Sequence, residues 1–422
     1  MRGLVEAVLP ARMGTPFRWL VGLSWVGNLG DGIALAAGPL LVAGQTQDPF
    51  LVALGALLQR LPWLVFGLQA GVLADRVDRR RLLVGVDLAR AGFLVVLASA
   101  LLTGDVGIAV VLAALFVLGV AEVFADTTSG TLLPMAVRRA DLGIGNARLM
   151  TGTLVMNEMV GPAVGAVLFV AGTAWPFVTE AVLLALSALL VSRMRLPVRE
   201  RPAERSHVRR DVVEGLRWTW GNPAVRTLTL TIVSFNVTYG AAWSVLVLYA
   251  DQRLALGAVG FGLLSTAMAV GGLLGTASYD WLERHAGLAT LMRIGLVLET
   301  LTHLALAVTT TAWVAMVVMV VFGAHAFVWS TTSRTVRMRA VPLGLQGRVG
   351  SVYFMGLFGG ILLGQLVGGL VARSWGITAP FWFGFAGSAV ILALIWRQLT
   401  HIAHAGDEPA GATSATGAVA AS

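Results

Sequence analysis

Long apolar segments separated by short polar connections run through the whole chain. A membrane-spanning helix needs roughly 20 apolar residues, and twelve segments of about that length can be found. Six lie near residues 17–41, 50–73, 82–103, 107–130, 147–170 and 174–194, and six near residues 224–249, 257–279, 288–309, 312–333, 348–372 and 377–399. The pattern predicts an all-α membrane protein with twelve transmembrane helices, so we expect the lipid bilayer to surround most of the chain.

The connections between these segments differ in charge. The N-terminus and every second connection after it hold nearly all of the loop arginines, whereas the remaining connections hold only Arg253 and Arg373. Positively charged loops stay on the cytoplasmic side of a membrane. We therefore expect both termini in the cytoplasm, in a multi-pass protein of the bacterial inner membrane.

The longest polar stretch divides the chain into two related parts. We predict an N-terminal six-helix bundle at residues 1–194, a cytoplasmic linker at 195–222, a C-terminal six-helix bundle at 223–400 and a disordered cytoplasmic tail at 401–422. The linker alternates apolar and charged residues with helical spacing, typical of an amphipathic helix on the membrane surface. A flexible charged linker is the alternative.

Several features of the first half recur in the second at a nearly constant offset. Asp75 and Arg79 reappear as Asp280 and Arg284, 205 residues later, and the glycine pair of residues 161–165 reappears at 364–368. Paired six-helix repeats of this kind build a cavity between two pseudo-symmetric bundles.

Composition excludes several classes of protein. The chain is 57% hydrophobic and 12% charged, with a mean hydropathy of +0.81, whereas soluble domains carry about 25% charged residues. The net charge of +8 comes from scattered arginines, so we expect no nucleic-acid partner. Cysteine is absent, and the six histidines are scattered. We expect no metal, no cofactor, no enzymatic activity and a monomer.

The densest charge lies in residues 71–81, GVLADRVDRRR, between the second and third predicted helices. This loop resembles the signature loop of the major facilitator superfamily, with Asp78 in place of the usual second glycine; the matching residues are Gly71, Asp75, Arg76, Arg79 and Arg80. The resemblance implies the two-bundle major facilitator fold, transport and a cytoplasmic gate. In such a gate Gly71 lets two helices approach closely, and Asp75 accepts hydrogen bonds from the start of the eleventh helix.

The same resemblance implies that Arg76 or Arg79 pairs with Asp126 near the inner end of the fourth helix. Asp280 and Arg284 occupy the equivalent loop of the second half. The alternative is that these arginines only fix the orientation of the protein in the membrane.

The fifth predicted helix contains Gly161, Pro162 and Gly165. This stretch resembles the proline–glycine motif of drug and metabolite antiporters, with Asn157 where another glycine is usual. Proline bends the helix, and the glycines allow close packing. A second resemblance is carried by the run DRVDRRR at residues 75–81, by Asp87 and Arg90 in the third helix, and by Glu214, Gly215 and Leu216 in the linker. This combination resembles the bacterial branch that contains enterobactin and macrolide exporters.

Ionisable residues inside the predicted helices are expensive and mark function. In the first half, those that we single out are Asp31, Arg60, Asp87, Arg90, Glu122 and Glu158. Glu122 and Asp126 are one turn apart, and two such carboxylates resist carrying charge together. As carriers of a coupling proton we rank Asp31 first, Glu158 second and Glu122 third. The alternative is a static ion pair of Asp31 or Glu158 with Arg60 or Arg90.

Polar and aromatic residues near these charges are candidates for lining a substrate cavity. Three aromatic residues of the seventh helix share one stripe, which faces either the cavity or lipid. His325 contacts substrate or is packed by hydrogen bonds. The full set of candidates is Asn28, Asn157, Phe235, Asn236, Tyr239, Trp243 and His325.

These features favour a proton-coupled exporter of an amphipathic small molecule such as an antibiotic, a siderophore or a related metabolite. A proton-coupled importer or a facilitator of a small nutrient uses the same fold and is the alternative. Sequence alone determines neither the substrate nor the coupling ion, because both depend on the mutual geometry of a few side chains.

Overall fold

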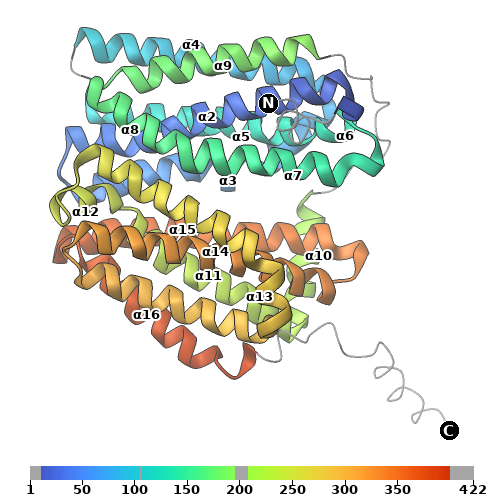
Figure 1. The fold of residues 1–422 in the computed structure, drawn as a ribbon, viewed down its shortest axis with the longest axis vertical. Helices are drawn as coiled ribbons and strands as arrows, with labels where there is room; N and C mark the ends of the chain where they lie inside the picture. Colours follow the sequence, from blue (N-terminus) through green and yellow to red (C-terminus); the bar gives the residue numbers. More distant parts are fainter. Residues whose placement is uncertain (1–10, 105, 195–207, 400–422) are drawn as a thin grey trace.

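The computed structural model describes residues 11–104, 106–194 and 208–399, and this part of the chain contains helices and no strand (Figure 1). In the first half the structure has η1 (Ala11–Met13), α2 (Gly14–Gln45), α3 (Pro49–Arg76), α4 (Arg79–Thr103), α5 (Ile108–Gly130), α6 (Leu133–Ala136), η2 (Arg139–Asp141), α7 (Leu142–Gly152), η3 (Thr153–Val160), α8 (Gly161–Ala171) and α9 (Trp175–Arg193). The second half has α11 (Pro223–Trp243), α12 (Leu246–Gln252), α13 (Gly257–Val308), α14 (Ala312–Ala340), η4 (Leu343–Leu345), α15 (Gln346–Trp375) and α16 (Ala379–Ile395). The helix α10 (Val208–Gly221) lies between the halves.

The two halves form separate bundles side by side, the first in blue and green and the second in light green to red (Figure 1). Within each bundle, glycines let helices approach closely. A Cβ atom at Gly271 of α13 would collide with the carbonyl of Val320 in α14, and one at Gly323 of α14 would collide with the carbonyl of Met268. Such contacts stabilise membrane bundles, where lipid removes the hydrophobic drive for helix association.

Helices occupy all twelve predicted segments, although their lengths differ from the prediction. In the described residues, nine helical stretches are long and apolar enough to cross a membrane, and a tenth is counted if α11 and α12, bent by 40°, are one span. The 52-residue α13 holds two predicted segments joined at Gly287, whose φ of 71° breaks the helical path. The 17-residue α16 is shorter. That all twelve cross the membrane stays a prediction.

The boundary predicted at residue 279 was wrong. The helix continues through Asp280 and Arg284 up to Gly287, because charged side chains at the end of a helix can extend into water without breaking it. Glycine accepts the positive φ that a turn requires at little cost.

Large apolar side chains cover the outside of the bundles. Val96 and Leu102 on α4 are about two-thirds exposed, and Val182 on α9 is 62% exposed. Exposed apolar surface on this scale is typical of contact with lipid, and the protein is a multi-pass membrane protein.

The linker contains the predicted helix, and that helix packs against the second bundle. Arg348, near the start of α15, donates to Asp211 at 2.9 Å and to Glu214 at 2.7 Å. A Cβ at Gly215 would collide with the backbone of Arg348. Val213 and Leu216 remain about half exposed, so an apolar face is available to the membrane surface. Residues 195–207 of the linker and 401–422 of the predicted tail lie outside the described residues.

Candidate functional site

Two cavities lie inside the protein between helices of both halves. One has a volume of about 600 Å³ and the other of about 420 Å³. Both are lined by Glu158, Tyr239, Met268 and Leu357. The first half contributes Glu158 and the second half contributes the other three, so both bundles shape the place where the cavities meet.

The predicted aromatic stripe of α11 faces these cavities. Phe235 and Tyr239 line the larger cavity, and Trp243 lines the smaller one together with Tyr239. The ring of Phe322 on α14 lies parallel to that of Tyr239, with centroids 5.9 Å apart. Of the two interpretations left open, contact with the cavity therefore agrees with the structure.

Glu158 and Asn157 lie in the π-helical segment η3, which directly precedes Gly161 and Pro162. Proline has no N–H, so the carbonyl of Glu158 loses its usual partner four residues on. The turn widens into a π-helix, a form that is frequent at functional sites. Thr266 of α13 donates to the carbonyl of Met159 at 2.8 Å and thus joins the two halves at this turn.

The glycines of the proline–glycine motif lie against α2. A Cβ at Gly161 would collide with Gly32, and one at Gly165 would collide with the backbone of Ile33. A larger residue at either position would push α2 and α8 apart, and with them the segment that carries Glu158.

A charge network lies within the first bundle, around Arg90 of α4. Its guanidinium donates to Asp31 of α2 at 2.6 Å and approaches Glu180 of α9 at 3.4 Å. One turn earlier on α4, Asp87 accepts a hydrogen bond from Ser187 of α9 at 2.9 Å. Arg90, Asp87 and Glu180 are buried, with exposures of 3%, 2% and 1%. Two carboxylates therefore contact this cation, and a third lies one turn away on the same helix.

Sequence reasoning placed Asp31, Asp87 and Arg90 in helices but missed Glu180. The available signal was a single acid within the apolar segment 174–194. Asp31 pairs with Arg90 and not with Arg60, which instead lines the smaller cavity together with Glu158 and Asn157.

The predicted pairing of Asp126 with Arg76 or Arg79 is absent from the described residues. Asp126 instead lines a third, small cavity of about 50 Å³, together with Asn28, Asp31, Asp87 and Arg90. Asn28 therefore lies beside the charge network and not in the central cavities. Glu122, one turn before Asp126, is half-buried on α5.

The loop at residues 71–81 differs from the prediction in its contacts. Asp75 accepts from Arg79 at 2.6 Å within the same loop and is exposed, so it does not contact the start of α15. A Cβ at Gly71 would meet nothing within 4 Å, so the expected close approach is absent. Arg76 is exposed, and Arg80 donates to the carbonyl of Ser192 at the end of α9.

The equivalent segment of the second half lies within helix α13 and has a different geometry. Arg284 donates to the backbone carbonyl of Asp280 at 3.0 Å, so the side-chain pair of the first half is not repeated.

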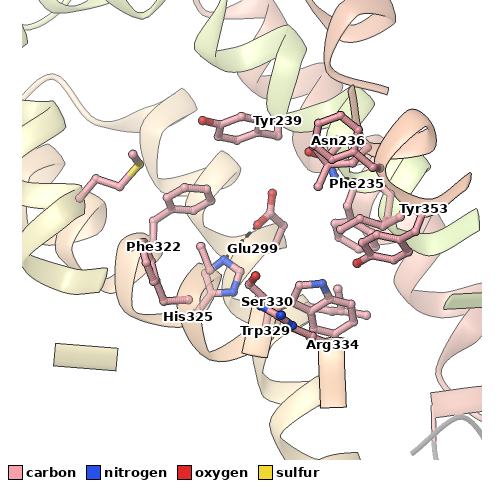
Figure 2. A pocket seen from close by; sticks show the side chains of 18 of the residues that line it. Phe235, Asn236, Tyr239, Glu299, Phe322, His325, Trp329, Ser330, Arg334 and Tyr353 are labelled. Carbon is pink, nitrogen blue, oxygen red and sulfur yellow. Dashed lines mark hydrogen bonds and ion pairs between the residues drawn. The ribbon is translucent and has the colours of Figure 1, made fainter. Parts of the chain in front are cut away.

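His325 is buried and lines the larger cavity, so contact with substrate stays a prediction. Its Nε2 lies 3.0 Å from Glu299 Oε2, at an angle outside hydrogen-bond geometry, so the expected packing by hydrogen bonds is not seen. Figure 2 shows Glu299 and His325 facing each other at the cavity wall, with Phe322 beside them. His303 lies 3.6 Å from the same carboxylate. Asn236 also lines this cavity and donates to the carbonyl of Ile232 at 2.7 Å.

Two helical bundles with a shared internal cavity are the architecture of a membrane transporter of the major facilitator type. The family described as transmembrane secretion effectors matches residues 7–413, and the chain belongs to that family within the major facilitator superfamily.

The sequence similarity to known proteins covers most of the chain. The multidrug efflux pump Tap of Mycolicibacterium fortuitum is 29% identical over 374 residues, which cover 83% of this chain and 88% of that protein. The enterobactin exporter EntS of Escherichia coli O9:H4 (strain HS) is 26% identical over 384 residues, 88% of this chain and 89% of the other.

Among solved structures, the nucleoside transporter NupG superposes with a TM-score of 0.72 at 14% identity, covering 92% of this chain and 99% of that one. At this identity the likeness supports the fold alone.

Proposed function

We propose that the protein exports an amphipathic small molecule from the bacterial cytoplasm by proton antiport. The observation that carries the proposal is the buried network around Arg90, within the bundle that also supplies Glu158 to the central cavities. Relatives named as a multidrug efflux pump and an enterobactin exporter support the outward direction. The aromatic walls of both cavities suit an amphipathic cargo such as an antibiotic, a siderophore or a related metabolite.

Charge balance supports a role for protons. Asp31, Asp87 and Glu180 are close to a single cation, Arg90, and buried charge is costly unless it is paired. With all four groups ionised, two negative charges would remain without a cation. Uptake of a proton removes part of this cost, and release of the proton restores it. Asp31 is the more exposed member of its pair with Arg90, at 10% of its side chain, and we propose it as the exchanging acid.

Glu158 is the second acid in the proposal, and its place is different. It lies where the two cavities meet, beside Tyr239, so substrate and proton can compete for it. Glu122, ranked third, lies on α5, one turn before Asp126.

Contacts between the halves support alternating access. At one end, Gln252 donates to Gln47 at 2.8 Å and Arg373 lies 3.7 Å from Asp48. These residues belong to the connections that the arginine distribution places outside, with both termini inside. At the opposite end, Asp75 pairs within its own loop. We propose that this is an inward-facing state, and that Asp75 exchanges Arg79 for the backbone amides at the start of α15 when the inner side closes.

Import of a small nutrient, or its facilitated diffusion, is the alternative. Sugars are poor candidates for the substrate, because their hydroxyl groups need many hydrogen-bond partners and the cavities have a wide aromatic lining. We also propose that the transporter works as a monomer and without enzymatic activity.

Inside-out membrane vesicles, acidified internally and containing a fluorescent pH reporter, test the proposal. We expect release of protons when an amphipathic antibiotic, dye or siderophore is added, and none in vesicles that lack the protein. Accumulation of a compound without proton movement would contradict antiport. Movement of substrate only toward the cytoplasm would favour the importer.

A further inference from the structure

One end of the larger cavity is basic. Arg334 and Arg337 of α14 both line it, as do Ser330 and Tyr353. Figure 2 shows Arg334 with Ser330 and Trp329 at the cavity wall. Residues three apart on a helix lie on the same face, so the two guanidinium groups extend from neighbouring positions. This cationic end is separate from the charge network around Arg90.

These two arginines differ from the other arginines at the same end of the bundle. Arg339 lies 3.7 Å from Glu283, and Arg348 pairs with two acids of α10. In the part of the chain that the structure describes, no ion pair involves Arg334 or Arg337.

Arg337 is the better defined of the two. Its guanidinium carbon lies 3.9 Å from the centre of the Tyr353 ring, which orients the group. Its Nη1 is buried and has no hydrogen-bond partner among the described residues. A buried donor without a partner is costly. An arginine that only orients the protein in the membrane needs its positive charge near the cytoplasm. Such a role does not explain why a hydrogen-bond donor of Arg337 is buried without a partner.

The surroundings of the pair define what it can bind. Phe235, Trp329 and Phe354 line the same cavity, which gives a planar apolar molecule large surfaces to contact. Two acids line this cavity: Glu299 is approached by His325 and His303, and Glu158 lies where the two cavities meet. The two arginines supply the positive charge of the cavity wall, and guanidinium groups suit the planar geometry of a carboxylate.

We propose that Arg334 and Arg337 form a subsite for the carboxylate, or a similar oxyanion, of an aromatic amphiphile. The aromatic body of the molecule lies against Phe235 and Trp329. The inference rests on the proposed function in that this anion belongs to the exported substrate. It narrows the substrate class to molecules that carry an anionic group at one end of an aromatic body.

Binding to the purified full-length protein in a neutral detergent tests the subsite. The probes are 2-naphthoate and 2-naphthamide, which share one ring system and differ in charge, measured by equilibrium dialysis. We expect naphthoate to bind about 10-fold or more tightly than naphthamide, the effect of a charge-assisted hydrogen bond. Arg334→Gln and Arg337→Gln should weaken naphthoate binding by a similar factor and leave naphthamide binding unchanged.

Arg339→Gln is the matched control, because it removes the same charge from the same helix outside the cavity lining. Equal loss of naphthoate affinity in this variant would overturn the subsite, since bulk charge would then explain the effect. Equal affinity of the wild-type protein for the two probes, or no binding of naphthoate, would also overturn it. Arg334→Gln keeps the test valid if Arg337→Gln disturbs packing on Tyr353. The assay measures no transport, so failure of export would leave these affinities unchanged.

Discussion

The guanidinium of Arg90 lies 2.6 Å from the carboxylate of Asp31, and this contact joins α4 to α2 inside the first bundle. The two residues are 59 positions apart in the chain. Glu180 of α9 lies on the same guanidinium at 3.4 Å, so three helices depend on one cation. Any change in the charge of this network therefore alters both packing and protonation.

Loss of Arg90 should destabilise the protein strongly. Arg90→Gln leaves Asp31 and Glu180 buried without their cation, which typically costs about 3–5 kcal/mol. We expect a lower melting temperature for the purified protein in detergent, with Arg284→Gln, at an exposed position of α13, as the control. Adding Asp31→Asn to Arg90→Gln should recover part of the loss. An unchanged melting temperature in the single variant would show that the network contributes little.

Pro162 should matter for transport more than for folding. Pro162→Ala supplies the missing N–H and allows η3 to close into an ordinary α-helix, which moves Glu158 relative to the cavities. We expect normal protein levels, a melting temperature equal to or above that of the wild type, and slower transport in vesicles. Pro223→Ala is the control, because Pro223 is in the first turn of α11, where the N–H is not needed. Transport at the wild-type rate in Pro162→Ala would show that the π-helix is not required for transport.

Asp75→Asn should reduce transport while protein levels stay normal. The change weakens the pair with Arg79 and the proposed contact with the start of α15 in the closed state. Asp78→Asn serves as a control in the same loop, since Asp78 caps α4 by accepting from the backbone of Arg81 and asparagine caps equally well. Uptake into inside-out vesicles, normalised to protein level, compares the two variants. Equal uptake rates in the Asp75→Asn and Asp78→Asn variants would contradict the gating role of Asp75. The loop arginines would then only fix the orientation of the protein in the membrane.

Arg348→Gln should release α10 from the second bundle. The variant loses the contacts with Asp211 and Glu214, so the helix opens more often and Arg217 becomes a better substrate for trypsin. We expect faster cleavage between the halves in limited proteolysis than in Arg253→Gln, whose arginine contacts backbone carbonyls elsewhere. Identical cleavage rates would mean that packing at Gly215 alone holds α10.

The fold was largely predictable from sequence because lipid imposes a simple rule. A span must be long and apolar, and arginines collect on one side, so all twelve helical segments could be located. The end of the helix at Gly287 was missed, since Asp280 and Arg284 look like a loop in sequence but lie within a helix.

The candidate site was predictable only in part. Burial of Asp31 and Arg90 follows from their place in apolar segments, but their partners depend on which helices face each other. Glu180 was missed for that reason. The pairing of Asp126 with the loop arginines was wrong because Asp126 lies on the cavity beside Asp31. Contacts of Asp75 depend on the conformational state, which no sequence pattern fixes.

The central claim is that Asp31 exchanges the proton that drives export. The direct test is transport in proteoliposomes with the Asp31→Asn variant, using a substrate found in the vesicle screen, with and without a pH gradient. We expect that transport driven by the gradient is lost in this variant while exchange of labelled for unlabelled substrate continues. Asp251→Asn, at an exposed position of α12, should behave as the wild type. Transport driven by the gradient at the wild-type rate in Asp31→Asn would contradict the claim.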